Sequence, residues 1–413
     1  MKWKLAHVIG VGLILLIAQP LLAGGPTNKS NRSAAYMRIL ARNAATEGAD
    51  TVTYNPAGTV KLEDGFHINV SAQYLDTEYS NNFLGADHTT DEPSVVPSIF
   101  MVYSKDRWAA FCGVDVPLGG GEVEYPTGNF TTFRVGQLLS QLTGLPLEAH
   151  ETRGESIGMA YTFGGAFQVN DWFAMSLAGR YVDATVEISA SADNGPLTSV
   201  IDYDADATGF GGILGLDFFL TEKTTIGFKY STNTDLKYEY SVNQGADILA
   251  TLGVIDGAET RDDLPAEVAL GISHQVSDKV RIEGGVNYYV NGSADMGGTT
   301  LREGLDDVID DSWEIGLGGE FAVADTFNLS VGYLYSTIGV DPEYSSTFLP
   351  DLDAHTIGGG FQWRATPMMA FDLALGGTFY DDDSYVDSSL GTPIEVEYEK
   401  RVLFLAVGLD FKF

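Results

Sequence analysis

The chain has 413 residues, with 57 Asp and Glu against 23 Lys and Arg, and its formal net charge is -34 at pH 7. This sign of charge excludes nucleic acid as a partner, because binding to a phosphate backbone requires basic residues. The single cysteine, Cys112, excludes a disulfide framework. A long chain that contains 48 Gly, 20 Tyr and 22 Phe and shows no linker favours one large β structure.

The first residues predict a secretory signal peptide. Lys2 and Lys4 precede an apolar run over residues 8–17, and the small residue Ala23 marks a cleavage point. We therefore expect residues 1–23 to be removed. The apolar run is too short to span a bilayer, and no later stretch reaches the roughly 20 apolar residues that a transmembrane helix needs. A helical inner-membrane protein is thereby excluded.

Residues 24–64 show no strand-like alternation and are predicted to form a separate hatch, or plug. Residues 33–43 carry apolar side chains at roughly helical spacing, and the motif Asn55-Pro56-Ala57-Gly58 follows as a turn or helix start. A segment of about 40 residues is too small to build a core of its own. We expect it to lie inside the β structure that the rest of the chain forms.

Residues 65–413 are predicted to form an all-β, transmembrane, antiparallel up-and-down barrel of about 14 strands. Ile315 and Leu317 keep one face of their segment apolar, while Glu314 and Gly316 fill the other. Such segments commonly have ten or more residues, which is the length that tilted membrane strands need. The strands are expected to begin near Phe66, Pro93, Trp108, Arg153, Trp172, Tyr203, Thr224, Leu264, Lys279, Asp311, Phe327, Asp353, Met369 and Tyr398.

The connections between these strands alternate between short turns and long loops. Lys105–Arg107 and Ser277–Lys279 are short turns, whereas the long loops hold most of the acidic residues, as at Asp381–Asp383. Outer-membrane barrels sort their loops in this way, and a soluble sandwich has no reason to do so. The acidic rim is either a solvated face or a divalent-cation site that bridges to lipopolysaccharide, although no known ligand spacing occurs.

The last strand supports the same location. Its apolar face is formed by Leu403, Leu405, Val407, Leu409, Phe411 and Phe413. A terminal aromatic residue on such a strand resembles the signal that the barrel assembly machinery reads. We therefore expect Phe413 to be recognised by that machinery. The expected place of the chain is the outer membrane of a Gram-negative-type bacterium, in contact with its lipid and lipopolysaccharide.

A family resemblance is carried by several stretches spread along the chain. These stretches are Ala41–Asp50, Tyr54–Gly58, Pro97–Tyr103, Trp108–Gly119, Asp263–Pro265, Leu270–Ile272 and Leu349–Asp351. They are similar to the FadL family of outer-membrane channels for long-chain fatty acids and aromatic hydrocarbons. The resemblance implies a plugged fourteen-strand barrel for passive uptake of a hydrophobic small molecule. It further implies capture at outer loops, transfer to an inner pocket, and sideways release past the hatch near the third strand.

The resemblance places the sideways opening at a kink in the third strand, where Gly113, Pro117 and Gly119 are the candidate residues. A proline cannot donate to a strand ladder and glycines weaken one, so these residues supply a physical cause for a kink. The alternative interpretation is that the strand simply ends there.

The longest loop follows the third strand and is the candidate outer capture site. Phe133, Leu138, Leu139 and Leu142 lie in it at near-helical spacing on an otherwise acidic rim. Exposed leucines are a liability unless they bind or cover something. The alternative is a cap that packs on itself over the barrel mouth.

Arg180, Lys229 and Arg281 fall on inward faces and are candidates to bind a ligand carboxylate inside the barrel. Each could equally pair with an inward carboxylate. The inward carboxylates are Glu267, Glu283, Glu314 and Glu320. Residues 24–32 are polar, whereas the FadL family commonly begins with an apolar stretch, so fatty acid specificity is not carried over.

Two other functions compete with hydrophobic uptake. A general porin for polar solutes would conduct ions openly, which a plugged barrel would not. An outer-membrane enzyme is disfavoured, because the histidines that follow the signal form no Gly-x-Ser-x-Gly, His-Glu-x-x-His or metal-spaced motif. We therefore expect no catalytic activity, no cofactor and no metal centre.

Overall fold

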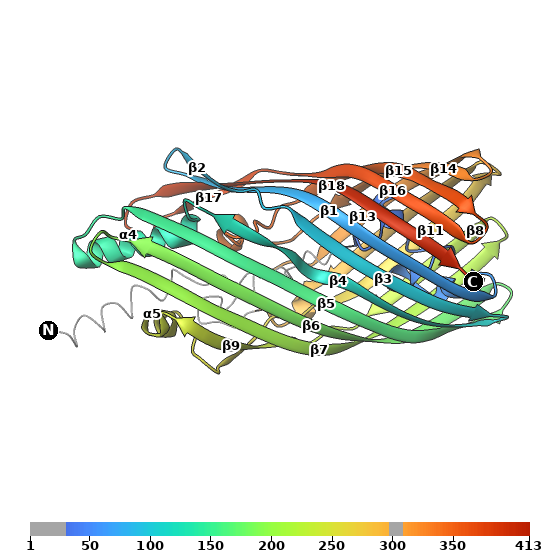
Figure 1. Ribbon diagram of the computed structural model, residues 1–413, viewed down its shortest axis with the longest axis horizontal. Helices are drawn as coiled ribbons and strands as arrows, with labels where there is room; N and C mark the ends of the chain where they lie inside the picture. The colour runs from blue at the N-terminus through green and yellow to red at the C-terminus, as the bar shows by residue number, and fades with distance from the viewer. Residues whose placement is uncertain (1–29, 297–308) are drawn as a thin grey trace.

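The computed structural model describes residues 30–296 and 309–413 (Figure 1), and the predicted signal peptide at residues 1–23 lies outside them. Within these ranges, 14 long antiparallel strands form a closed barrel, which confirms the predicted fold class. The strands are β1 (Gly65–Phe83), β3 (Ser94–Lys105), β4 (Trp108–Tyr125), β5 (Ala149–Asn170), β6 (Phe173–Asp193), β7 (Thr198–Thr221), β8 (Thr224–Ser231), β11 (Ala266–Ser277), β12 (Val280–Val290), β13 (Ser312–Ala324), β14 (Phe327–Ser336), β15 (Ala354–Thr366), β16 (Met369–Tyr380) and β18 (Ile394–Lys412).

Shorter elements lie in the long loops. They are β2 (Ala86–Thr90), α4 (Phe130–Thr143), β9 (Lys237–Gln244), α5 (Ala246–Thr251), β10 (Glu259–Arg261), η2 (Asn291–Ser293), η4 (Pro342–Tyr344) and β17 (Asp383–Asp387). In Figure 1, α4, α5, β2 and β17 gather at one end of the barrel, and the C-terminus lies at the other. We call the end with α4 and α5 the outer end. No helix in the described ranges is long and apolar enough to cross a membrane.

The barrel closes by a seam between its first and last strands. β1 pairs with β18 from His67↔Lys412 to Phe83↔Val396, and with β3 on its other side. The terminal residue takes part in this seam, because Phe413 N donates a hydrogen bond to the backbone oxygen of residue 66 at 2.9 Å. The two strands therefore leave no free sheet edge at the seam.

The outward faces of the strands carry an apolar belt. Leu177, Phe210 and Leu317 are 69%, 76% and 63% exposed, while the residues that alternate with them point inward. Aromatic side chains gather at the end with the tight turns, where the rings of Trp172 and Phe218 stack with centroids 6.3 Å apart. An apolar outer face flanked by aromatic residues is suited to contact with lipid.

The plug, residues 30–64, lies inside the barrel, nearer to the end that holds the C-terminus (Figure 1). Its short helices are α2 (Ala34–Met37), α3 (Thr51–Tyr54) and η1 (Pro56–Lys61). Most of its side chains are buried, although they are too few to form a core without the wall. The plug therefore depends on the barrel for its structure, and β1 begins directly after it at Gly65.

Inward glycines on the wall let the plug backbone come close. A Cβ atom on Gly316 would lie 2.1 Å from Leu40 O, and one on Gly318 would lie 2.1 Å from Ile39 O. Heavy atoms do not approach to this distance without a shift of the backbone. The absence of side chains at these two positions of β13 is thus what seats this part of the plug.

Candidate functional site

The motif Asn55-Pro56-Ala57-Gly58 begins η1 and anchors the plug to β7. The Asn55 side chain accepts a hydrogen bond from Ala57 N (3.3 Å) and donates one to Asp217 Oδ1 (2.7 Å). Pro56 occupies the first turn of η1, where an N–H group has no helical partner. A Cβ atom on Gly58 would lie 2.2 Å from a backbone oxygen of the plug, so only glycine fits. The motif therefore fixes the shape and place of the plug.

Two buried arginines hold the plug to the wall and to itself. Arg38 Nε lies 2.8 Å from Asp372 Oδ1 on β16, and the same guanidinium contacts Glu320 on β13. Arg42 Nη2 lies 2.9 Å from Asp50 Oδ1 within the plug. Loss of one partner from a buried pair leaves an uncompensated charge, so such pairs resist displacement.

The three predicted lumen cations point inward and contact the plug or the wall. Arg281 Nη1 lies 2.5 Å from Glu47 Oε1 of the plug. Lys229 Nζ lies 2.9 Å from Glu267 Oε1, and Arg180 Nη2 donates to the hydroxyl of Thr234, just after β8, at 2.9 Å. Among the described residues that line the larger cavity below, none of these three cations occurs. Arg281 and Lys229 thus pair with carboxylates, whereas the hydrogen bond of Arg180 goes to a hydroxyl group.

β3 and β4 separate along their outer halves. Their ladder runs only from Lys105↔Trp108 to Ile99↔Val114, so within the described strands Ser94–Ser98 are not paired to β4. The same part of β3 stays paired to β1. The hydrogen-bonded wall is therefore interrupted between these two neighbouring strands.

Two register shifts bend β4 at the level of this interruption. The β4–β5 register shifts between Asp115 and Leu118 and again between Gly119 and Gly121. Each shift places one extra residue on β4, which bends a strand. Pro117 lies in the first shift, and Gly119 has a φ of 61°, a conformation that favours glycine.

Gly113, the third residue assigned to the kink from the sequence, lies outside the bend. It is in regular register with Phe100 on β3 and with Thr162 on β5. A Cβ atom there would lie 2.7 Å from the Phe100 ring and 3.3 Å from the Val52 side chain of the plug. Gly113 therefore serves close packing of the plug, and the kink is made further along β4.

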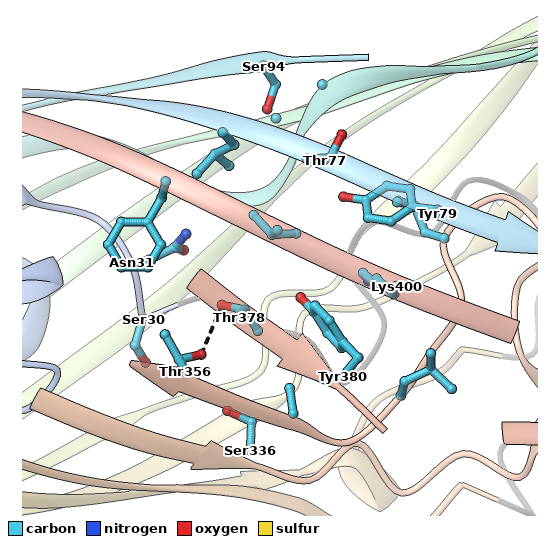
Figure 2. A pocket seen from close by; sticks show the side chains of 18 of the residues that line it. Ser30, Asn31, Thr77, Tyr79, Ser94, Ser336, Thr356, Thr378, Tyr380 and Lys400 are labelled. Carbon is cyan, nitrogen blue, oxygen red and sulfur yellow. Dashed lines mark hydrogen bonds between the residues drawn. The ribbon is translucent and has the colours of Figure 1, made fainter. Parts of the chain in front are cut away.

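A cavity of about 180 Å³ lies between the plug and the outer loops. Met37 and Leu40 line it from the plug, and Phe404 lines it from β18. Ser94 of β3 and Gly119–Gly121 of β4 also line it, so the cavity reaches the interruption in the wall. Figure 2 shows this cavity from close by, with Ser94 at one side and Ser30 of the plug at the other.

Lys400 is a cation of this cavity. Its Nζ lies 4.9 Å from the Tyr79 ring centroid and 4.7 Å from that of Tyr380 (Figure 2). The same group donates a hydrogen bond to Pro350 O at 3.2 Å. An ammonium group among aromatic rings is suited to contact an anionic group of a ligand. Lys400 was not among the lumen cations expected from the sequence, although it lies two residues before the inward-facing Val402 on the last strand.

The predicted capture loop forms the helix α4. Asn129 caps the start of the helix, since its side chain accepts a hydrogen bond from Thr132 N at 3.0 Å. Gly144 caps its end, with a φ of 74° and so the left-handed conformation common after a helix. Both ends are thus specified by local residues, which explains why the near-helical spacing of the loop was visible in the sequence.

The four residues predicted for capture lie in different surroundings on α4. Phe133 is buried in an aromatic cluster with Phe83. Leu138 packs against the main apolar core, the largest cluster of buried apolar side chains, which includes Leu249 and Phe348. Leu139 and Leu142 are half-buried. The structure therefore does not gather the four side chains into one open patch.

A second, smaller pocket of about 40 Å³ lies beside α4. Its lining is almost entirely apolar and includes Val135 of α4, Ile188 of β6, Ile201 of β7, Leu249 of α5 and Phe348 of the loop after β14. We call it the outer pocket. Val135 lies three and seven residues before Leu138 and Leu142, on the same face of α4, although neither leucine lines the pocket. The contribution of α5 to the pocket was not foreseen.

Comparison with known proteins places these features in a family. A family model described as outer membrane protein transport protein (OMPP1/FadL/TodX) matches residues 14–413. The chain belongs to this family. The resemblance to FadL channels noted from the sequence is thereby confirmed, and the FadL family and its structural neighbours are transporters rather than enzymes. An outer-membrane location follows for the barrel.

Solved structures of FadL-like proteins share the fold at low identity. A Pseudomonas aeruginosa FadL homologue is 17% identical with a TM-score of 0.71, covering 92% of this chain and 98% of that one. The Ralstonia pickettii toluene transporter TbuX is 16% identical with a TM-score of 0.64, over 92% and 98%. The Pseudomonas putida toluene transporter TodX is 16% identical with a TM-score of 0.63, over 89% and 94%. No curated protein sequence matches the chain.

Proposed function

We propose that this protein is a passive outer-membrane channel for hydrophobic small molecules, either long-chain fatty acids or related hydrocarbons. The observation that carries the proposal is that one cavity touches both the plug and the interrupted wall. Met37 and Leu40 line its inner side, and Ser94 with Gly119–Gly121 line its side at β3 and β4. A molecule in the cavity is thus next to a place where the wall lacks hydrogen bonds.

A sideways exit fits an apolar cargo. The plug is held by buried ion pairs such as Arg38–Asp372, so the path straight through the barrel is filled by charged and polar groups. The interruption between β3 and β4 lies in the wall, whose outward face is the apolar belt. Because apolar molecules partition from water into hydrocarbon, release in this direction needs no energy input.

The residues that line the cavity favour a cargo molecule with an apolar body, either with or without an anionic head group. Leu40, Leu334 and Phe404 provide apolar contacts, and Lys400 provides a positive charge. TbuX and TodX are described as toluene transporters. Toluene is thus an example of a neutral cargo for proteins of this fold. We therefore propose both cargo types as test substrates.

Uptake by cells tests the proposed function. A host that lacks family members should take up radiolabelled oleate or toluene faster when it produces this protein, and mass spectrometry after mild detergent purification should find alkyl or aromatic ligands. Uptake equal to that of the empty host for both probes would reject the proposal. A general porin would instead give a large ion current in a planar bilayer, whereas the plugged barrel should give a large current only when residues 30–64 are deleted or displaced.

A reversible cross-link tests the sideways exit. The Cβ position of Gly121 lies 2.9 Å from Ser94 Cβ, so Ser94→Cys with Gly121→Cys should form a disulfide across the gap after a small shift. In a Cys112→Ser background, oxidation should stop uptake and a reductant should restore it. Ser80→Cys with Thr89→Cys is the matched control, since these hydroxyls are 3.0 Å apart on strands that are already paired. Unchanged uptake with the gap cross-linked would exclude this exit.

A further inference from the structure

The loop between β14 and β15 lies between the two internal spaces. Phe348 lines the outer pocket, whereas Leu349, Asp351 and Leu352 line the cavity. Neighbouring residues of one loop segment thus face the two spaces. The segment Thr347–Pro350 is therefore a wall that the outer pocket and the cavity share.

Side chains of the barrel hold this segment in place. Three wall strands, β1, β4 and β18, each donate one hydrogen bond to its carbonyl groups. The bonds are Asn81 Nδ2 to Thr347 O (2.9 Å), Tyr125 Oη to Phe348 O (2.9 Å) and Lys400 Nζ to Pro350 O (3.2 Å). The segment lies outside the described strands, so its movement would leave the barrel ladders intact.

The same segment also contacts the helix of the outer pocket. Thr347 Oγ1 lies 2.9 Å from Thr131 Oγ1 at the start of α4. Phe348, the next residue, is 4% exposed and packs in the main apolar core. Polar contacts thus hold the backbone of the segment, and its apolar Phe348 side chain faces the outer pocket.

We propose that Thr347–Pro350 is an internal barrier and that Phe348 is the side chain that a cargo molecule displaces on its way from the outer pocket to the cavity. This inference rests on the proposed function, because it concerns the route of the same cargo. An apolar molecule replaces the contacts of Phe348 with equivalent ones. A hydrated solute must shed its water at this point, so the barrier selects for apolar cargo.

A disulfide that locks the segment to α4 tests the barrier. Thr131→Cys with Thr347→Cys replaces two hydroxyls that are 2.9 Å apart, again in a Cys112→Ser background. Oxidation should abolish uptake of radiolabelled toluene and oleate by cells, and a reductant should restore it. The single variants, treated in the same way, are the controls, and a heat-dependent gel shift reports that the barrel is folded. Full uptake with the disulfide formed would overturn the proposal that this segment is a barrier.

Substitution of Phe348 tests the side chain without a cross-link. Initial rates of toluene uptake should rise in Phe348→Ala and fall in Phe348→Trp. Phe379→Ala is the matched control, since Phe379 is 48% exposed on the outer face of β16 and should leave the rate unchanged. Equal rates for all three residues at position 348 would refute the inference while leaving the proposed function intact. No uptake by the unaltered protein would refute the proposed function instead.

Discussion

Arg32 Nε of the plug lies 3.7 Å from Asp115 Oδ2, on the last residue of β4 that pairs regularly before the strand bends. The same carboxylate accepts a hydrogen bond from Thr53 Oγ1 of the plug at 2.6 Å. Ser98 of the facing strand β3 donates to Arg32 O at 2.7 Å. The plug therefore contacts both strands that border the interruption in the wall.

We expect Asp115→Asn to loosen the plug next to this interruption. Removal of one partner from a buried ion pair typically costs about 3–5 kcal/mol, and both side chains here are buried. The variant should show faster proteolysis of the plug and a larger ion current in planar bilayers. Glu78→Gln is the control, because its pair with Arg401 is about half exposed and such pairs contribute little. Equal behaviour of the two variants would contradict this role of Asp115.

Adjacent glycines on β13 should respond differently to the same substitution. Gly318→Ala places a Cβ atom against Ile39 O of the plug, so the plug or the wall must shift and thermal stability should fall. Gly319→Ala meets the side chain of Phe321 at 3.4 Å and Arg281 O at 3.9 Å, which are ordinary contacts, and should change stability little. Thermal melts of the two purified variants check this difference, and a Gly318→Ala melt like that of the unaltered protein would show that the plug is loosely seated.

Lys400→Met should affect anionic and neutral cargo differently. A hydrogen bond to a charged group contributes about 1.5–3 kcal/mol, so loss of the ammonium group should weaken oleate binding roughly tenfold or more. Toluene carries no charge and should bind with little change. Lys400→Arg should retain most oleate binding, because it keeps the charge. Binding measured by tryptophan fluorescence or calorimetry checks the comparison, and a parallel loss of both ligands would assign Lys400 a structural role only.

The Glu47 carboxylate should make plug docking sensitive to acid. Burial alone would raise the pKa of Glu47, but the guanidinium groups of Arg281 and Arg42 lower it from 4.5 to about 2. The stabilising contribution of this carboxylate is therefore complete above pH 4.5 and is lost as the pH falls from 4.5 toward 2. Proteolysis of the plug with an acid-active protease should accelerate over this range in the unaltered protein. Glu47→Gln should lack that part of the acceleration, and an identical pH profile would rule out the assignment.

The strand positions could be predicted wherever the wall contacts lipid. β4, β8, β14 and β16 begin at the predicted residues Trp108, Thr224, Phe327 and Met369, because the turn end is marked by short polar turns and aromatic residues. At the outer end the predictions were less accurate. β5 begins at Ala149 rather than near residue 153, since a strand that extends beyond the membrane has water on its outer face and loses the apolar alternation.

The candidate site was predictable only in part, for a related reason. Pro117 and Gly119 could be selected because their effect on a strand is local. The contacts of Lys400 and Phe348 depend on segments far apart in the chain, such as Pro350 beside the last strand and Tyr125 beside the loop after β14. No periodicity reports such contacts. The ion-pair partners of Arg281 and Lys229 could not be predicted either. Period-2 alternation shows which face of a strand a residue lies on, but not which side chain it contacts.

The seam between Phe66 and Phe413 sets an order of assembly. The plug precedes β1 in the chain, and β1 is also the strand to which the last residue pairs. Once that seam has formed, the wall encircles the plug and holds it through contacts on many strands. We therefore expect the plug to be in place while the sheet is still open, so that the final strand both completes the barrel and encloses a segment that precedes every strand in the chain.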